Sequence, residues 1–200
     1  MADFAELARL HLPEYLTPKQ KEDLWKELRE FPTIGSFYMA PDEDERTLQG
    51  DGWRGLIVLR FETGERRPLT GLILSNSCDI APANPRPLPT NVVFAPLLAL
   101  DRYAERLRAV GQTKQQVDSV LETIRHQEVT SLFYLPAQPY GPVESVAFFD
   151  DVHSHPTADF LGGSRTRIFR LSLPAFYALL VKLSIHFCRL QEGLTRPAAA

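Results

Sequence analysis

The densest run of chemically active side chains is Ser75, Asn76, Ser77, Cys78 and Asp79. It directly follows an apolar stretch typical of a strand, and strand ends commonly carry binding and catalytic sites. The polar groups suit binding of a substrate, and a thiol becomes a nucleophile where a nearby histidine lowers its pKa. The same polar side chains also cap turns and bond local backbone groups. The sequence leaves both interpretations open, and we predict substrate binding by these five residues.

A second run contains His153 and His155 and begins at Asp150. The alternation of His153 and His155 would place both rings on one face of a strand. Imidazole transfers protons near neutral pH, and together with carboxylates it binds divalent metals. A cysteine- or metal-dependent hydrolase built on both histidines, Cys78 and Asp79 is therefore one alternative. No known spacing of metal ligands is present, so we expect no cofactor and no metal.

The third group of candidate residues consists of arginines. Arg67 precedes Pro68, which favours an extended backbone and lets the guanidinium lean over a sheet. Arg165 and Arg167 are two positions apart on an expected strand and so point the same way. A guanidinium is always charged and binds phosphate oxygens with two donors. We therefore expect these three arginines to form a phosphate-binding surface.

Composition limits the classes of function. The chain has 200 residues, which suffices for one well-filled core, and its net charge is −3. That charge gives no general attraction to nucleic acid, so any such contact must come from a local patch. The two cysteines are far apart in sequence, and we predict no disulfide. No stretch approaches the roughly 18 apolar residues of a membrane span, and no secretory signal is visible, so we expect a cytoplasmic protein without membrane contact.

The elements that must position these residues change in character near residue 50. The first 50 residues are predicted to be helical, with a helix starting at Thr17-Pro18, and residues 41–46 form an exposed acidic linker. Strands are predicted at 55–61, 70–75, 91–98, 132–135, 145–149 and 166–171. Further helices are expected at 98–110, 113–126 and 174–190.

This order of elements predicts an α+β protein with a curled antiparallel sheet. We divide it into an N-terminal helical extension, residues 1–50, and a main domain, residues 51–200. A helical pair, residues 98–127, is inserted into the main domain.

Several short motifs of the main domain follow the order of one known family. They are residues 54–58, 64–68, 72–76, 92–97, 146–151 and 167–187. In this order they resemble the MazF/PemK family of toxin endoribonucleases. The resemblance implies a small SH3-like, PemK-like antiparallel β-barrel, usually a homodimer, in a toxin–antitoxin or phage-defence system. It further implies single-stranded RNA and an antitoxin segment as partners.

The resemblance also implies a chemistry. Members of the family cut RNA without a metal, using the 2′-hydroxyl of the substrate as nucleophile. Such a reaction needs a cation to stabilise the developing charge and groups that move protons. The resemblance assigns the first role to Arg67 and places Asp150 at the acidic position of the family. His153 stands near where many members carry an arginine, and we expect its imidazole to transfer a proton as a third catalytic residue. We expect Arg67, Cys78 and Asp150 to open onto one concave face.

Leu98 departs from the family pattern. It stands where the family keeps a threonine or serine whose hydroxyl helps to hold the phosphate. Leucine offers no such group. The alternative that follows is a non-catalytic interaction module that keeps the barrel and uses its added helices for a protein partner.

Overall fold

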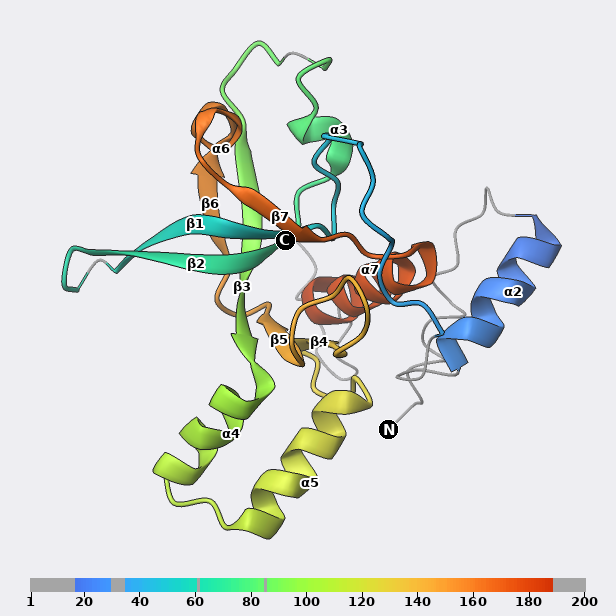
Figure 1. Cartoon of the computed structure of the whole chain (residues 1–200), viewed down its shortest axis with the longest axis vertical. Coiled ribbons are helices and arrows are strands. Elements are labelled where there is room, and N and C mark those ends of the chain that lie inside the picture. The colour runs from blue at the N-terminus through green and yellow to red at the C-terminus, as the bar shows by residue number, and fades with distance from the viewer. Residues whose placement is uncertain (1–16, 30–34, 61, 85, 189–200) are drawn as a thin grey trace, which may run out of the picture.

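The structure is a computed structural model that describes residues 17–29, 35–60, 62–84 and 86–188. These residues form an α+β fold with one antiparallel sheet of seven strands and six helices (Figure 1). The strands are β1 (Gly52–Arg60), β2 (Glu65–Ile73), β3 (Asn91–Ala99), β4 (Leu132–Leu135), β5 (Ser145–Phe148), β6 (His153–Pro156) and β7 (Thr166–Phe169). The helices are α2 (Pro18–Arg29), α3 (Ser77–Ile80), α4 (Leu100–Ala109), α5 (Lys114–Arg125), α6 (Thr157–Gly162) and α7 (Leu173–Cys188).

Strand β3 is the centre of the sheet. The hydrogen-bonded order is β4-β5-β3-β2-β1-β7, and β6 pairs with β3 outside this path. One edge of β3 pairs with β2, while the other edge pairs first with β6 and then with β5. Strand β6 was not among the predicted strands, and it forms because its four residues pair with the first half of β3.

The strand pairing does not close the sheet into the predicted barrel. In the described part of the chain, pairing runs from β4 to β7 and does not join these two edges. Strand β7 pairs with β1 over residues 52–54 only, and the register of β1 shifts at Gly55, which has a left-handed backbone with φ of 89°. A bulge of this kind bends a strand out of its sheet. The result is a curled, open antiparallel sheet.

Each face of the sheet carries its own core. Helix α7 packs on one face, where Leu72 and Ala95 lie in a cluster with Leu179. On the other face, Leu56, Phe94 and Phe160 lie in a second cluster, which α6 and α3 cover. A third cluster attaches the helical pair to β4 and β5. Burial of these apolar side chains supplies the main stabilisation of the fold.

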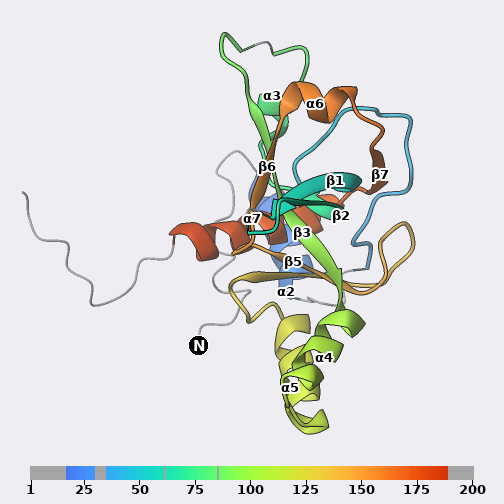
Figure 2. The same ribbon diagram turned by 90° about the vertical axis from the view of Figure 1, so that its left-hand side faces the viewer.

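The predicted inserted helices are present. Helices α4 and α5 project together from one end of the molecule (Figures 1 and 2). Thr113 caps α5 in a reciprocal box with Gln116, which fixes where the second helix begins. Leu98 and Ala99 belong to β3 and not to α4, because they pair with β5.

The prediction of helical structure for the first 50 residues holds only in part. Helix α2 begins at Pro18 as expected, and residues 1–16 and 30–34 lie outside the described residues. Residues 35–50 are not helical. Within this segment, Tyr38 is buried and forms an isolated β-bridge with Leu171. The acidic stretch is not a free linker either, because Asp42 forms ion pairs with Arg167 and Arg170.

None of the helices in the described ranges combines the length and the apolar character needed to cross a membrane.

Candidate nucleic-acid interface

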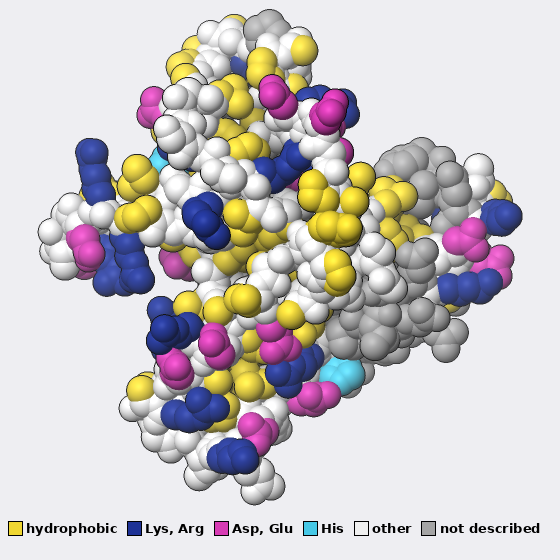
Figure 3. Space-filling model, viewed as in Figure 1, with side chains coloured by type: hydrophobic (Ala, Val, Ile, Leu, Met, Phe, Trp, Pro, Cys, Tyr) yellow, Lys and Arg dark blue, Asp and Glu magenta, His cyan; other side chains and the backbone are white. Residues whose placement is uncertain are grey.

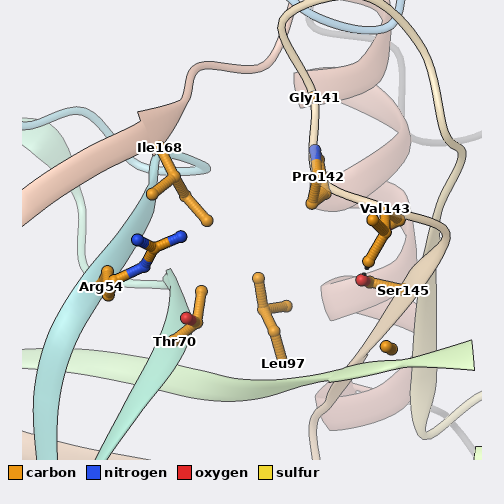
Figure 4. Close-up of a pocket in the computed structure, with 9 residues that line it drawn as sticks. Arg54, Thr70, Leu97, Gly141, Pro142, Val143, Ser145 and Ile168 are labelled. Atoms are coloured by element: carbon orange, nitrogen blue, oxygen red, sulfur yellow. Dashed lines mark hydrogen bonds between the residues drawn. The ribbon is translucent and has the colours of Figure 1, made fainter. Parts of the chain in front are cut away.

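A pocket of about 560 Å³ opens on the α7 side of the sheet. Residues from β1, β2, β3 and β7 form its floor and one side, and the loop that precedes β5 forms the other side (Figure 4). The lining residues are Arg54, Thr70, Leu97, Ala99, Gly141, Pro142, Val143, Ser145 and Ile168. This volume is within the ordinary range of small-ligand sites.

Arg54 provides the charge of this pocket. Among the described residues that line it, Arg54 is the single charged side chain, and its guanidinium points into the open space (Figure 4). Thr70 stands directly opposite Arg54 on the neighbouring strand. In the part of the chain that the structure describes, neither side chain has a hydrogen-bond or ion-pair partner. The arrangement suits an anion whose remaining part is apolar.

The loop that forms the far wall is held in place by buried contacts. The Tyr38 hydroxyl donates to the Pro136 carbonyl at 2.9 Å, and the Phe37 backbone N–H donates to Gln138 Oε1 at 2.8 Å. A side chain at Gly141 would come within 2.1 Å of the Tyr38 ring, so only glycine fits there. The pocket is therefore pre-formed.

The outer part of the β1–β2 hairpin, residues 56–60 and 62–68, follows the pocket; we call it the arm. Two cross-strand pairs follow Arg54 and Thr70 on the same side of the hairpin, namely Ile57 with Pro68 and Leu59 with Arg66. Ile57 and Leu59 are each 42% exposed. Figure 3 shows cationic side chains over the arm, all of them arginines, together with an acidic side chain and exposed apolar atoms. On the pocket side, Arg54 is thus followed by the apolar Ile57, Pro68 and Leu59 and by one further cation, Arg66.

Arg67, the catalytic arginine implied by the resemblance, is on the other side of the arm. It pairs with Val58, and Arg60 pairs with Glu65 on that same side. Val58 packs against the core cluster that contains Phe94. Arg67 therefore shares a side of the hairpin with the β6 histidines and not with the pocket.

Both β6 histidines lie on the Phe94 ring. His155 stacks on it with a centroid distance of 5.4 Å, and His153 with one of 5.9 Å. His153 Nε2 donates to Asp151 Oδ1 at 2.9 Å, whereas His155 Nε2 accepts from the Ile57 backbone N–H at 2.9 Å. Burial, followed by the nearby Arg165, lowers the pKa of His155. Asp150 is exposed in the turn between β5 and β6.

The predicted substrate-binding run around Cys78 serves local structure. Ser75 Oγ accepts from the Val93 backbone at 2.7 Å, Asn76 Oδ1 accepts from the Cys78 backbone at 2.9 Å and caps α3, and Ser77 Oγ accepts from the Gln49 backbone at 2.9 Å. Asp79 forms an ion pair with Arg86. These hydrogen bonds are the ones expected if the polar side chains cap turns and bond backbone groups. The Cys78 side chain itself is exposed.

Arg67 and Cys78 lie near opposite ends of β2. Arg67 lies near the start of β2 and Cys78 follows its end, so six residues of extended strand, about 20 Å, separate Arg67 from the end of β2. No group of three or more His, Cys, Asp or Glu side chains within the described ranges is placed to hold a metal. The metal-dependent form of the hydrolase alternative therefore has no assembled ligand group in these residues.

Arg165 and Arg167 bind other parts of the protein. Arg165 donates to the Asp159 carbonyl and, at 2.9 Å, to the Phe160 carbonyl, at the end of α6. Arg167 donates to the Asp44 carbonyl at 2.6 Å and to Asp42 Oδ1 at 2.8 Å. Of the two arginines that were expected to bind phosphate, Arg165 thus bonds α6 and Arg167 bonds the acidic stretch.

No family model matches the chain, and no curated protein matches it.

The sequence did not single out Arg54 and Thr70 as site residues. Their signal was present: each is a polar residue inside a strand of mainly apolar neighbours. Such a residue indicates a position where a strand faces solvent or a ligand. The pairing register that places the two side by side is a property of the folded sheet.

Proposed function

We propose that the chain binds single-stranded RNA, with Arg54 holding a phosphate in the pocket and the arm continuing the contact. The observation that carries this proposal is the charge of the pocket: Arg54 has no counter-ion among the described residues. A carboxylate-free pocket with one guanidinium favours an anionic ligand. Phosphate contacts supply most of the sequence-independent affinity for nucleic acid.

The apolar walls indicate what accompanies the phosphate. Leu97, Val143 and Ile168 line the pocket around Arg54 and Thr70. Such walls accept the face of a base, and the bases of a single strand are accessible where those of a duplex are stacked and paired. The volume of about 560 Å³ suits one nucleotide.

The charge of the hairpin supports the same function. The chain as a whole carries −3, yet residues 54–67 contain four arginines and two glutamates. Of these arginines, Arg54 and Arg66 lie on the pocket side of the hairpin, where they supply the local positive charge that binding to a polyanion requires. The exposed Ile57 and Leu59 between the arginines offer apolar contact to further bases.

The test is binding of a short fluorescent single-stranded RNA measured by anisotropy. Arg54→Gln removes the charge with little change of shape, and we expect the Kd to rise about tenfold. Lys26→Gln is the matched control, because Lys26 is an exposed cation on α2 and loses the same charge. The same Kd for Arg54→Gln and the natural protein would refute the proposal.

The resemblance adds metal-independent cleavage to this function. One observation supports it: Arg67 lies on the side of the hairpin that faces the Phe94 cluster, and His153 stacks on Phe94 while bonded to Asp151. A guanidinium and an imidazole on one side of the molecule match the roles of charge stabilisation and proton transfer. The homodimer, the antitoxin partner and the toxin–antitoxin or phage-defence role follow from the same resemblance.

The second candidate is a non-catalytic protein-interaction module. It is favoured by Leu98, which packs in the cluster with Leu100 and Ile124. Where the family has a hydroxyl, this chain has the leucine side chain of Leu98, which helps to attach the helical pair to the sheet. A protein partner held by α4 and α5, with RNA left uncut, would favour this candidate.

A further inference from the structure

One side-chain hydrogen bond joins the arm to a strand 98 residues away in the sequence. The backbone N–H of Ile57 donates to His155 Nε2 at 2.9 Å. Ile57 comes two residues after Gly55, where the left-handed backbone bends β1 out of the sheet. The bond therefore holds the arm just beyond the bend.

The arm has little other support on this edge. Among the described strands, β7 pairs with β1 at residues 52–54 and none pairs with that edge of residues 56–60. His155 thus occupies the place that the next strand of a sheet would take. An unpaired strand edge of this kind leaves the orientation of a hairpin weakly determined.

The imidazole is itself fixed from two sides. Its ring lies nearly parallel to the buried Phe94 ring, with an interplanar angle of 14°. Its backbone pairs with Val92 of β3. A ring held in this way presents Nε2 to Ile57 in one geometry, with the proton of the neutral form on Nδ1.

We propose that neutral His155 is the positioning residue that locks the arm across β6, so that Arg66 continues the surface that begins at Arg54. This inference rests on the proposed function, since Arg66 and Arg54 then contact one RNA strand. The bond places the arm and makes no contact with RNA itself. Its loss is expected to weaken RNA binding about fivefold through a loosened arm.

The lock requires an unprotonated Nε2, because a protonated imidazole has no acceptor. The charged and titratable groups that face His155 are Arg165, Asp159 and His153. Burial and Arg165 lower the pKa of His155, so the ring is neutral at neutral pH. As pH falls below the ordinary value of 6.5, the unfolded chain takes up the proton first and the folded state loses stability. The bond itself breaks when the pH passes through the lowered pKa of folded His155.

Two substitutions at His155 distinguish the contribution of the Nε2 hydrogen bond from that of the stacked ring. His155→Phe keeps a ring on Phe94 and removes the acceptor, whereas His155→Gln keeps an acceptor. Amide hydrogen exchange of Ile57, measured by NMR, should speed up at least tenfold in His155→Phe and change little in His155→Gln. His153→Phe is the control for exchange alone, since His153 also stacks on Phe94 and bonds to Asp151 instead of the arm.

RNA anisotropy completes the test. The affinity of the natural protein relative to His155→Gln should fall as the pH is lowered below the ordinary imidazole value of 6.5, far enough to protonate His155. If the amide of Ile57 exchanges at the same rate in His155→Phe as in the natural protein, the proposed role of His155 is wrong. This holds even where Arg54→Gln still weakens RNA binding. Faster Ile57 exchange without any RNA binding by the natural protein would support the lock and overturn the proposed function.

Discussion

Arg54 and Thr70 face each other across β1 and β2, and both side chains line the same pocket. The pair combines a guanidinium with a hydroxyl, the two groups that most often accompany a bound phosphate. Thr70→Val keeps the shape of the side chain and removes the hydroxyl. We expect the Kd for single-stranded RNA to rise about threefold, measured by anisotropy. Thr123→Val, on α5 and away from the pocket, should leave it unchanged.

The two neighbouring arginines of the arm should behave differently. Arg66→Gln should weaken RNA binding and lower the slope of log K against log salt by about 1, because Arg66 lies on the pocket side of the arm. Arg67→Gln should change that slope less than Arg66→Gln does, because Arg67 lies on the other side of the arm. If the chain cleaves RNA, Arg67→Gln should abolish the 2′,3′-cyclic ends that form in the presence of EDTA. Equal slopes for the two variants would contradict the placement of Arg66 on the pocket side of the arm and of Arg67 on the other side.

The buried ion pair of Arg170 and Asp51 should be the most sensitive charged contact of the fold. Arg170 Nε donates to Asp51 Oδ1 at 3.0 Å, and the two side chains are only 6% and 1% exposed. Arg170→Met would leave the carboxylate buried without its partner and should lower the free energy of unfolding by about 3–5 kcal/mol in urea. Arg46→Met, at a 77% exposed arginine, should cost less than about 1 kcal/mol.

Lys182 should make stability depend on pH. Its Nζ donates to the Gln127 and Val129 carbonyls at 2.6 Å each, and burial lowers its pKa to about 7. The unfolded chain, with an ordinary value of 10.5, binds the proton more strongly across this window. The free energy of unfolding should therefore rise with pH above 7, by up to about 1.4 kcal/mol per pH unit from this group. Lys182→Met should remove that slope; an identical slope would contradict the assignment.

The sequence was informative where one segment determines its own structure. The run Asn91–Ala99 is apolar and β-branched, and it forms the central strand. The cap at Thr113 marks the second inserted helix. Strand β6 carries no apolar run, and only its pairing with β3 and the stacking on Phe94 make it a strand. That support comes from residues far away in the chain and leaves no local pattern.

The candidate site was harder to predict for the same reason. The polar run at Ser75–Asp79 has the composition of a site, yet its hydroxyls bond Val93 and Gln49. Arg167 has the charge of a phosphate ligand, but the acidic stretch folds back onto it. In each case the bonding partner is distant in sequence. The sequence shows which side chains have the chemistry to bind a ligand, but it does not show that other parts of the protein already bond them.

The most direct test of the central claim is to map the bound RNA on the protein. Amide NMR shifts recorded while a short single-stranded RNA is added should change first around Arg54, Thr70, Leu97 and the loop at Gly141, and then along the arm. The duplex form of the same RNA should produce smaller changes. Shifts that gather on α2 or α7, or no shifts at all, would contradict RNA binding at this pocket.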